Sequence, residues 1–274
     1  MHLQEMLKLA LLEDAPFGDI TTESAVPDVP VVGVVLAKAS GIMAAEPLFK
    51  ALHDILPVRI RRKVADGERF GEGDVLAEVE GGAHDVLLLE RTMLNLLGRM
   101  CGIASLTAEF VRRAGGVPIY DTRKTLPLWR YLDKYAVRMG GGYNHRMSLS
   151  EIVMVKDNHK RLAGSLRRAV LNVRERLGEH VPLIAEVESE EELRSLEGLK
   201  VDWVLLDNMS PETLRRLIPL ARTYGFKVEV SGGITLDNVS EYAALRPDRI
   251  SVGSLTKAAS PVDISLEVGL KISA

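Results

Sequence analysis

The fold is decided by residues 182–208, which read PLIAEVESEEELRSLEGLKVDWVLLDN. Two continuous apolar runs, at 182–189 and 201–208, flank a charged segment with helical spacing. Continuous apolar runs joined by a helix predict neighbouring parallel strands that are buried on both faces. Both runs end in polar side chains, and ligands bind such sheets beyond the carboxyl ends of the strands.

The same pattern extends over the C-terminal half of the chain. Four further apolar runs lie at 117–124, 152–159, 226–233 and 248–254, with helical patterns between several of them. Strand–helix alternation with short spacing predicts an α/β barrel built from βα units. A helix cap or a turn would explain any one polar strand end, but six in succession favour a functional edge.

The N-terminal half has a different pattern. Apolar residues at helical spacing within 3–11 predict an amphipathic first helix. Short strand-like runs between 31 and 82 predict a small sheet with glycine turns. A long helical pattern over 84–116 follows and ends at a glycine pair.

Composition limits the function. The 274 residues carry a formal net charge of -3, which argues against general nucleic-acid binding. Positive charge is nevertheless concentrated within 134–160, around three consecutive glycines, and this indicates a small anionic ligand. The single cysteine, Cys101, excludes an intrachain disulfide, and we interpret it as a small apolar core residue. Because we find neither a signal-peptide pattern nor an apolar run of about 18 residues, we expect a cytoplasmic protein without a membrane partner.

Carboxylates follow two of the predicted strands. Glu186 and Glu188 point to the same side of one strand because side chains alternate, and Asp207 ends the next. Hard oxygen ligands in this number favour Mg²⁺ over zinc. Hydrogen bonding to sugar hydroxyls, or charge balance with nearby lysines and arginines, would use the same residues.

Two glycine-containing strand ends predict a phosphate site. Ser231, Gly232 and Gly233 follow one strand and precede a helical pattern, so backbone N–H groups and a helix N-terminus would meet a phosphate there. Gly253 and Ser254, one strand later, would complete the cradle, and a phosphate site after the last two strands is common in barrels. An ordinary turn would show the same glycines.

Five cationic or ionisable residues complete the predicted edge: Arg123, Lys124, His145, Arg146 and Lys156. Guanidinium groups bind planar carboxylates through two hydrogen bonds, whereas lysines suit phosphates as point charges. The set therefore fits a dicarboxylate or a diphosphate. A solvated basic face is the alternative.

These motifs resemble the quinolinate phosphoribosyltransferase family, also called carboxylating nicotinate-nucleotide pyrophosphorylase. The resemblance rests on motifs that occur in the same order and spacing over nearly the whole chain: ALLEDAPFGDITT, ERTMLNLLGRMCGIAS, DTRKTLP, GGGYNHR, VKDNH, AEVE, LLDN, VSGGIT and ISVGSLT. Each motif alone is short, but the ordered combination is specific.

The resemblance implies a fold and a reaction. The fold would be an open, incomplete α/β barrel over 113–258, with a smaller N-terminal α/β sandwich over 1–112 on which 259–274 packs back. The enzyme would convert quinolinate and phosphoribosyl pyrophosphate to nicotinate mononucleotide, pyrophosphate and CO₂ with Mg²⁺ in NAD biosynthesis. It would act as a homodimer, or an assembly of dimers, in which one N-terminal domain covers the partner's barrel mouth.

The resemblance also implies roles for individual residues. Quinolinate would contact Arg123, His145, Arg146 and Lys156, together with Arg91 from the partner subunit. The catalytic residues would be Lys124, Glu188 and Asp207, of which Glu188 and Asp207 would hold Mg²⁺ directly or through water. The 5′-phosphate would lie among Ser231, Gly232, Gly233, Gly253 and Ser254. Glu186 belongs to the same edge.

The chain departs from the family pattern at a few positions. After the Arg-Lys pair the family commonly has T-x-P-G-L-R, whereas this chain has Leu128 in place of the glycine. We expect the loop backbone to change there. Ser148 replaces a frequent glycine, and 15–17 differ within the opening motif.

Four other functions remain open at this stage. Nicotinate phosphoribosyltransferase uses a monocarboxylate and needs fewer cations. A relative of the family associated with molybdenum uptake would lack the intact DTRKT and KDNH motifs. An aldolase-type barrel would use Lys156 as a Schiff-base lysine. A regulatory barrel would bind phosphoribosyl pyrophosphate without consuming it.

Overall fold

The computed structural model describes residues 3–271, which form two compact units. The first takes its described residues from Met1–Ala108, Thr125–Gly141 and Thr256–Ala274, and the second takes them from Glu109–Lys124 and Gly142–Leu255. No described helix is both long enough and apolar enough to span a membrane. The cytoplasmic location stays a prediction.

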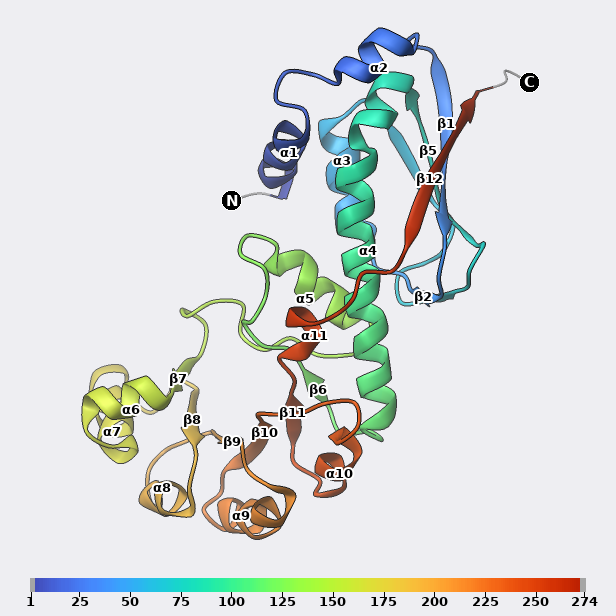
Figure 1. The fold of residues 1–274 in the computed structure, drawn as a ribbon. Helices are drawn as coiled ribbons and strands as arrows, with labels where there is room; N and C mark the ends of the chain where they lie inside the picture. The colour runs from blue at the N-terminus through green and yellow to red at the C-terminus, as the bar shows by residue number, and fades with distance from the viewer. Residues whose placement is uncertain (1–2, 272–274) are drawn as a thin grey trace. The chain divides into compact units, whose positions relative to one another are not determined.

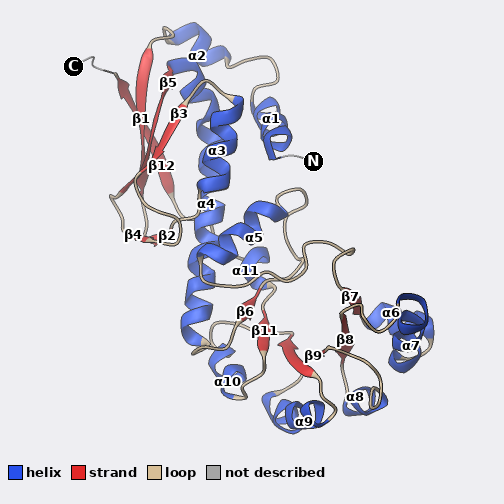
Figure 2. Ribbon diagram, turned by 180° about the vertical axis from the view of Figure 1, so that it is seen from behind, coloured by secondary structure: helices blue, strands red, loops and turns tan. Residues whose placement is uncertain are grey.

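The first unit is an antiparallel sheet covered by helices. The sheet order is β12-β1-β5-β3, formed by Ile264–Leu270, Pro30–Ala37, Val75–Gly82 and Arg59–Arg62. Residues along β1 alternate between buried and partly exposed, so one face of the sheet packs on the core. Figure 2 shows this sheet beside α3 and α4. The helices are α1 (Leu3–Asp14), α2 (Ile20–Ala25), α3 (Glu46–Ile55) and α4 (Ala83–Arg113), and β2 (Gly41–Ile42) pairs with β4 (Arg69–Phe70).

The last described strand belongs to the first unit, because β12 pairs with β1 along its whole length. The structure differs from the expected boundaries in another segment. Residues 125–141, which include α5 (Arg130–Met139), belong to the first unit and not to the barrel.

The reason is a buried ion pair that α5 makes with α4. Asp133 accepts two hydrogen bonds of 2.8 Å from the Arg99 guanidinium, and its carboxylate also accepts the Leu126 backbone N–H at 3.2 Å. Gly140 ends α5 so close to α4 that a Cβ would overlap the Ala104 carbonyl oxygen. The first of the three consecutive glycines is therefore a packing requirement.

The second unit is an open parallel barrel, as expected. Six strands pair in the order β6-β11-β10-β9-β8-β7, and they span Ile119–Tyr120, Arg249–Ser251, Lys227–Ser231, Trp203–Asp207, Leu183–Val187 and Val153–Val155. Among the described residues the two edge strands, β6 and β7, do not pair with each other, so the barrel is incomplete. Tyr143 covers the β6 edge through a bridge to Tyr120.

Helices connect the strands from β7 to β11, and Figure 1 shows them along one side of the sheet. They are α6 (Asp157–Ala163), α7 (Leu166–Leu177), α8 (Glu190–Ser195), α9 (Pro211–Thr223) and α10 (Val239–Ala244), and the short α11 (Ser254–Lys257) follows β11. All residues of β8 are buried, which explains its continuous apolar pattern. Because the six strands are parallel, their polar ends lie at one edge of the sheet.

The loop position at which the family commonly has glycine lies in the left-handed region of backbone conformation. Leu128 has φ 70°, the left-handed conformation that a glycine adopts without strain. The backbone thus keeps a glycine-type turn with a leucine in it. The side chain is 63% exposed, so burial contributes little compensation.

We expect Leu128→Gly to leave the free energy of unfolding unchanged or to raise it by up to about 1 kcal/mol. Relief of left-handed strain, about 1–2 kcal/mol, exceeds the glycine entropy cost of about 0.5–1 kcal/mol. The control is Leu126→Gly in the same loop, at a position without positive φ, which should lower stability. Urea unfolding measures both, and equal losses in the two variants would contradict the strain assignment.

Candidate functional site

Two arginines at the strand-end edge lack a counter-ion. Arg123 follows β6, and its buried Nε has no hydrogen-bond partner. Arg146 is buried, and its Nη1 donates to the Ile152 carbonyl at 2.7 Å. Burial lowers the pKa of Arg146, and the like charge of Arg123 lowers it further, while Glu151 acts in the opposite direction. Because neither guanidinium forms an ion pair within the described residues, the pair is suited to an anionic ligand.

The segment that carries Arg146 is held by Asp121, which follows β6 and is fully buried. Its carboxylate accepts the His145 backbone N–H at 2.8 Å and the Asn144 side-chain amide at 2.7 Å. Tyr143 exchanges backbone hydrogen bonds with Ile119 and Asp121. Arg146 is therefore fixed on an extension of the barrel sheet.

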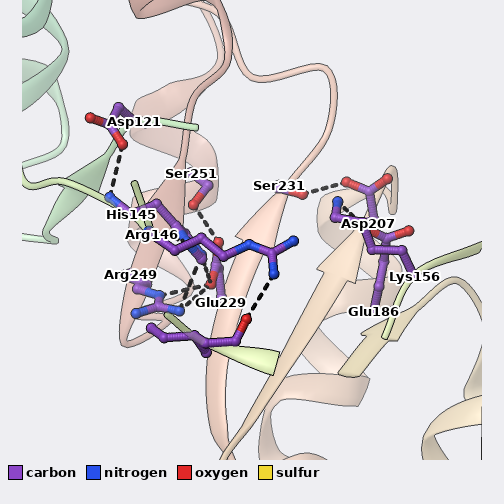
Figure 3. A network of polar contacts seen from close by, with 11 residues as sticks. Asp121, His145, Arg146, Lys156, Glu186, Asp207, Glu229, Ser231, Arg249 and Ser251 are labelled. Carbon is purple, nitrogen blue, oxygen red and sulfur yellow. Dashed lines mark hydrogen bonds and ion pairs between the residues drawn. The ribbon is translucent and has the colours of Figure 1, made fainter. Parts of the chain in front are cut away.

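His145 connects this segment to a buried carboxylate in β10. Its Nε2 lies 3.3 Å from Glu229, and its Nδ1 accepts the Arg146 backbone N–H at 2.9 Å. Glu229 also accepts hydrogen bonds from Arg249 and Ser251 (Figure 3). Burial raises the pKa of Glu229, but hydrogen bonds from His145 and Ser251 and the charge of Arg249 outweigh it and lower the pKa. Both ring nitrogens of His145 thus have partners within the protein, and its direct contact with the substrate stays a prediction.

Lys156 stands at the start of α6, immediately after β7. Its Nζ donates to Glu186 at 2.8 Å, and the Asp157 backbone N–H reaches the other oxygen of the same carboxylate at 3.3 Å. Glu186 is buried and therefore positions Lys156 at the edge of the sheet.

Three carboxylates form an oxygen cluster at the ends of β8 and β9. One ligand oxygen from each of Glu186, Glu188 and Asp207 lies within 4.8 Å of the others. Glu188 pairs with the buried Lys160 at 2.8 Å. Burial lowers the pKa of Lys160, but its hydrogen bonds to Glu188 and Glu192 outweigh this and raise the pKa. The expected carboxylates are therefore brought together, with two lysines against them.

The loop after β10 is shaped for close approach of the backbone. Gly232 has φ +90°, and a Cβ there would lie 2.5 Å from the Asn208 backbone nitrogen. Ser231 donates to Asp207, which ties the loop to the carboxylate cluster (Figure 3). The expected helix does not follow directly, because α10 begins only at Val239. Any phosphate contact here would come from the loop N–H groups and not from a helix N-terminus.

Gly253 lies beside Lys124. A Cβ on Gly253 would come 3.1 Å from Lys124 Cδ, so the ends of β6 and β11 meet in space, and the predicted catalytic lysine lies beside one of the predicted phosphate-binding glycines. Ser254 begins the four-residue α11 next to them. The structure thus gathers the predicted residues of the second unit at one edge.

Two expectations concern residues of the first unit. Arg91 is exposed on α4 and forms no ion pair within the described chain. The basic run 134–160 belongs to both units, because Lys134 and Arg138 lie in α5 of the first unit and His145, Arg146 and Lys156 lie in the second. Its positive charge divides between the two units.

Sequence reasoning missed Asp121, Lys160, Glu229, Arg249 and Ser251 as site residues. A charged residue between two valines of a predicted buried strand was the available signal for Glu229. Its partner Arg249 is opposite it in the parallel register, and that register is not visible in the sequence.

Comparison with protein families agrees with this geometry. Residues 19–101 match the family model of the quinolinate phosphoribosyl transferase N-terminal domain, and residues 103–267 match that of the C-terminal domain. The chain belongs to the quinolinate phosphoribosyltransferase family. The resemblance inferred from the motifs is confirmed, and the protein is a phosphoribosyltransferase of NAD biosynthesis.

Relatives match over almost the full length. A probable nicotinate-nucleotide pyrophosphorylase (carboxylating) of Bacillus subtilis is 37% identical, over 98% of this chain and 94% of its own. The rat nicotinate-nucleotide pyrophosphorylase (carboxylating) is 39% identical, over 94% of this chain and 88% of its own.

Solved structures show the same fold. NadC from Streptococcus pyogenes is 34% identical with a TM-score of 0.90, over 98% of each chain. Human nicotinic acid phosphoribosyltransferase is 11% identical with a TM-score of 0.60, over 96% of this chain and 74% of its own, and therefore shares the fold alone.

We expect Gly232→Ala to lower the free energy of unfolding by about 2–5 kcal/mol, because its Cβ meets a backbone atom that cannot rotate away. Gly233→Ala is the matched control: it has φ +63° but open space around its Cβ, so about 1 kcal/mol of strain is expected. Urea unfolding of both variants compares the costs. A smaller loss in Gly232→Ala than in Gly233→Ala would contradict the close approach to Asn208.

Proposed function

We propose that this enzyme converts quinolinate and phosphoribosyl pyrophosphate to nicotinate mononucleotide, pyrophosphate and CO₂. The observation that carries the proposal is the pair of arginines without a counter-ion, Arg123 and Arg146. Two guanidinium groups whose charges act on each other suit a ligand with two adjacent carboxylates on an aromatic ring. Lys156 adds a third cation to the same edge.

In the proposed reaction the arginines orient the pyridine ring, and its nitrogen attacks the anomeric carbon while the bond to pyrophosphate breaks. Lys124, beside Gly253, neutralises charge on the leaving group. Glu188 and Asp207 stabilise the positive charge that develops on the ribose ring. Orientation of two substrates supplies up to about 7–11 kcal/mol in well-aligned systems.

Loss of CO₂ needs no further catalytic group. Once the ring nitrogen has formed four bonds it is positively charged and accepts the electron pair of the adjacent carbon–carboxylate bond. CO₂ leaves, and the ring carbon takes a proton from solvent. Cys101 has no part in this chemistry, because it is buried and its burial raises the thiol pKa to about 12.

We also propose Mg²⁺ as the metal cofactor. The oxygen cluster of Glu186, Glu188 and Asp207 fits a hard cation, with the ligand oxygens within 4.8 Å of one another. When bound, Mg²⁺ supplies positive charge to the pyrophosphate group. Lys156 and Lys160 already neutralise Glu186 and Glu188, so water-mediated contacts suit the cluster better than a full set of direct carboxylate ligands.

The Schiff-base alternative is disfavoured by the contacts of Lys156. Its Nζ is held in an ion pair with Glu186, whereas a Schiff-base lysine must be uncharged to attack a carbonyl. The nicotinate, molybdenum-associated and regulatory alternatives are distinguished from the proposal by an activity assay, because only the proposed enzyme releases CO₂ from quinolinate.

We expect CO₂ release from carboxyl-labelled quinolinate only when phosphoribosyl pyrophosphate and Mg²⁺ are both present. Arg146→Ala should lower kcat/KM by the equivalent of about 2–5 kcal/mol, the scale of a broken buried charge pair. Arg168→Ala, an exposed arginine of α7, is the control and should retain activity. Turnover of nicotinate alone would refute the dicarboxylate pocket, and turnover of neither substrate would favour the regulatory or molybdenum-associated alternatives.

We further propose a homodimer in which Arg91 completes the partner's quinolinate pocket. Arg91 is exposed and has no ion pair within the described residues. The first unit also exposes apolar side chains that a dimer interface would bury, with Leu12 55%, Phe17 94% and Ile20 75% exposed.

A mixing experiment tests this arrangement. We expect Arg91→Ala and Arg146→Ala each to be nearly inactive, and a mixture of the two, exchanged through mild denaturation, to regain activity. Each heterodimer contains one intact site if Arg91 acts across the interface, so about a quarter of all sites would be intact. No recovery in heterodimers confirmed by native mass spectrometry would place Arg91 in its own subunit's site or outside any site.

A further inference from the structure

Glu229 is a carboxylate that the proposed reaction does not use. It lies in the middle of β10 and is completely buried. Arg249 of the neighbouring strand donates to it from Nε at 2.8 Å and contacts it from Nη2 at 2.5 Å. Ser251 donates to its other oxygen, and Figure 3 shows both residues beside it.

The burial of this ion pair is not explained by stability alone. Interior strands of a parallel sheet are normally apolar on both faces. A buried ion pair has a desolvation cost that often cancels its attraction, so apolar residues of similar volume would serve the core as well. The ion pair also contacts a residue at the strand-end edge of the barrel, and this contact suggests a role beyond stability.

That connection runs through the imidazole of His145. Nδ1 accepts the backbone N–H of Arg146 at 2.9 Å and therefore carries no proton. The proton of the neutral ring lies on Nε2, which faces Glu229 at 3.3 Å and donates to it. Arg249 Nη2 also lies 3.4 Å from Nε2, but the contact joins two donors and is not a hydrogen bond in this tautomer.

Two hydrogen bonds fix Arg146, one from its backbone and one from its side chain. Its backbone N–H is bound by His145, and its guanidinium is bound by the Ile152 carbonyl at 2.7 Å. Rotation or a change of tautomer at His145 would break the first of these hydrogen bonds. The orientation of the Arg146 side chain therefore depends on Glu229, because Glu229 holds the imidazole of His145 in place.

We propose that Glu229 is a positioning residue for the carboxylate-binding arginine. Its carboxylate holds His145 in the Nε2-protonated neutral tautomer, and His145 in turn fixes Arg146. The proposal rests on the proposed function in one respect, that Arg146 binds a substrate carboxylate. It gives His145 an indirect role in place of the direct contact inferred from the motifs.

The first measurement reads the tautomer in the unmodified enzyme. Nitrogen-15 NMR of labelled imidazoles distinguishes a protonated from an unprotonated ring nitrogen, and His145→Gln identifies the His145 signals among the six histidines. We expect a bare Nδ1 and a protonated Nε2. A proton on Nδ1 overturns the proposal, whatever the activity of the enzyme. This result needs neither substrate nor turnover.

The second measurement separates the two substrates. We expect Glu229→Gln to raise KM for quinolinate about 10–100-fold. The same scale is found when a metal-binding histidine loses the residue that hydrogen-bonds its other ring nitrogen. KM for phosphoribosyl pyrophosphate should change by less than about threefold, because Glu229 is proposed to act on Arg146 through His145, whereas the loop after β10 is tied to Asp207 through Ser231. Equal increases in both KM values, or none, would refute a role directed at Arg146.

The matched control is Asp202→Asn. Asp202, immediately before β9, is also a carboxylate of the second unit paired with an arginine, Arg174, at 3.4 Å. It accepts the Leu183 backbone N–H at the start of β8, away from the strand-end edge. This variant should lose stability without a selective rise in KM for quinolinate. A selective rise in the control as well would overturn the proposal by making the effect a general consequence of sheet destabilisation.

Ser251→Ala covers the case in which Glu229→Gln does not fold, because it removes one donor and keeps both charges of the ion pair. It should raise KM for quinolinate in the same direction by a smaller factor, and no selective rise would count against the proposal. Calorimetric binding of quinolinate to the wild type separates two kinds of failure. If the wild type neither binds nor consumes quinolinate, the proposed function fails, while the tautomer result still decides whether Glu229 holds His145.

Discussion

The site depends on two like charges, those of Arg123 and Arg146, which act on each other and form no ion pair within the described residues. Like charges repel strongly where the effective dielectric is low. The pKa of Arg146 reflects this, because burial and the charge of Arg123 both lower it. A flexible loop would relax by moving the charges apart. The backbone that carries Arg146 therefore has to be fixed by contacts that do not neutralise the guanidinium itself.

The structure meets this requirement with carboxylates that bind the residues next to Arg146 and not its guanidinium group. Asp121 binds backbone and amide N–H groups of the segment before Arg146, and Glu229 binds the imidazole of His145. Neither carboxylate forms an ion pair with Arg123 or Arg146. The lysines differ, because Lys156 and Lys160 are paired directly with Glu186 and Glu188. An anion therefore meets bare guanidinium groups on one side and neutralised lysines on the other.

The sequence was sufficient to predict which polar residues stand at the ends of the barrel strands. It was not sufficient to predict the polar contacts inside the barrel. Continuous apolar runs identify buried parallel strands, and parallel strands bring their polar ends together without any knowledge of register. The Glu229–Arg249 pair depends on register, and so does the contact between Gly253 and Lys124. The sequence also did not predict that α5 belongs to the first unit, because the Arg99–Asp133 ion pair that fixes α5 joins residues far apart in the chain. At Leu128 the sequence gives no sign of a left-handed residue, because leucine rarely adopts that conformation.

The network behind the arginines also explains how a charged interior is compatible with a packed barrel. The Arg249 guanidinium lies 3.8 Å from the ring centroid of Trp203 and 4.9 Å from that of Tyr120, so aromatic faces and Glu229 together surround its charge. Arg249 stands at the beginning of β11, whereas Arg146 stands at the edge where the strands end. The chain of contacts from Trp203 through Arg249, Glu229 and His145 thus extends from the packed sheet to the ligand edge. A rigid connection of this kind keeps a repelling pair of arginines in place before any ligand arrives, which reduces the ordering cost of binding.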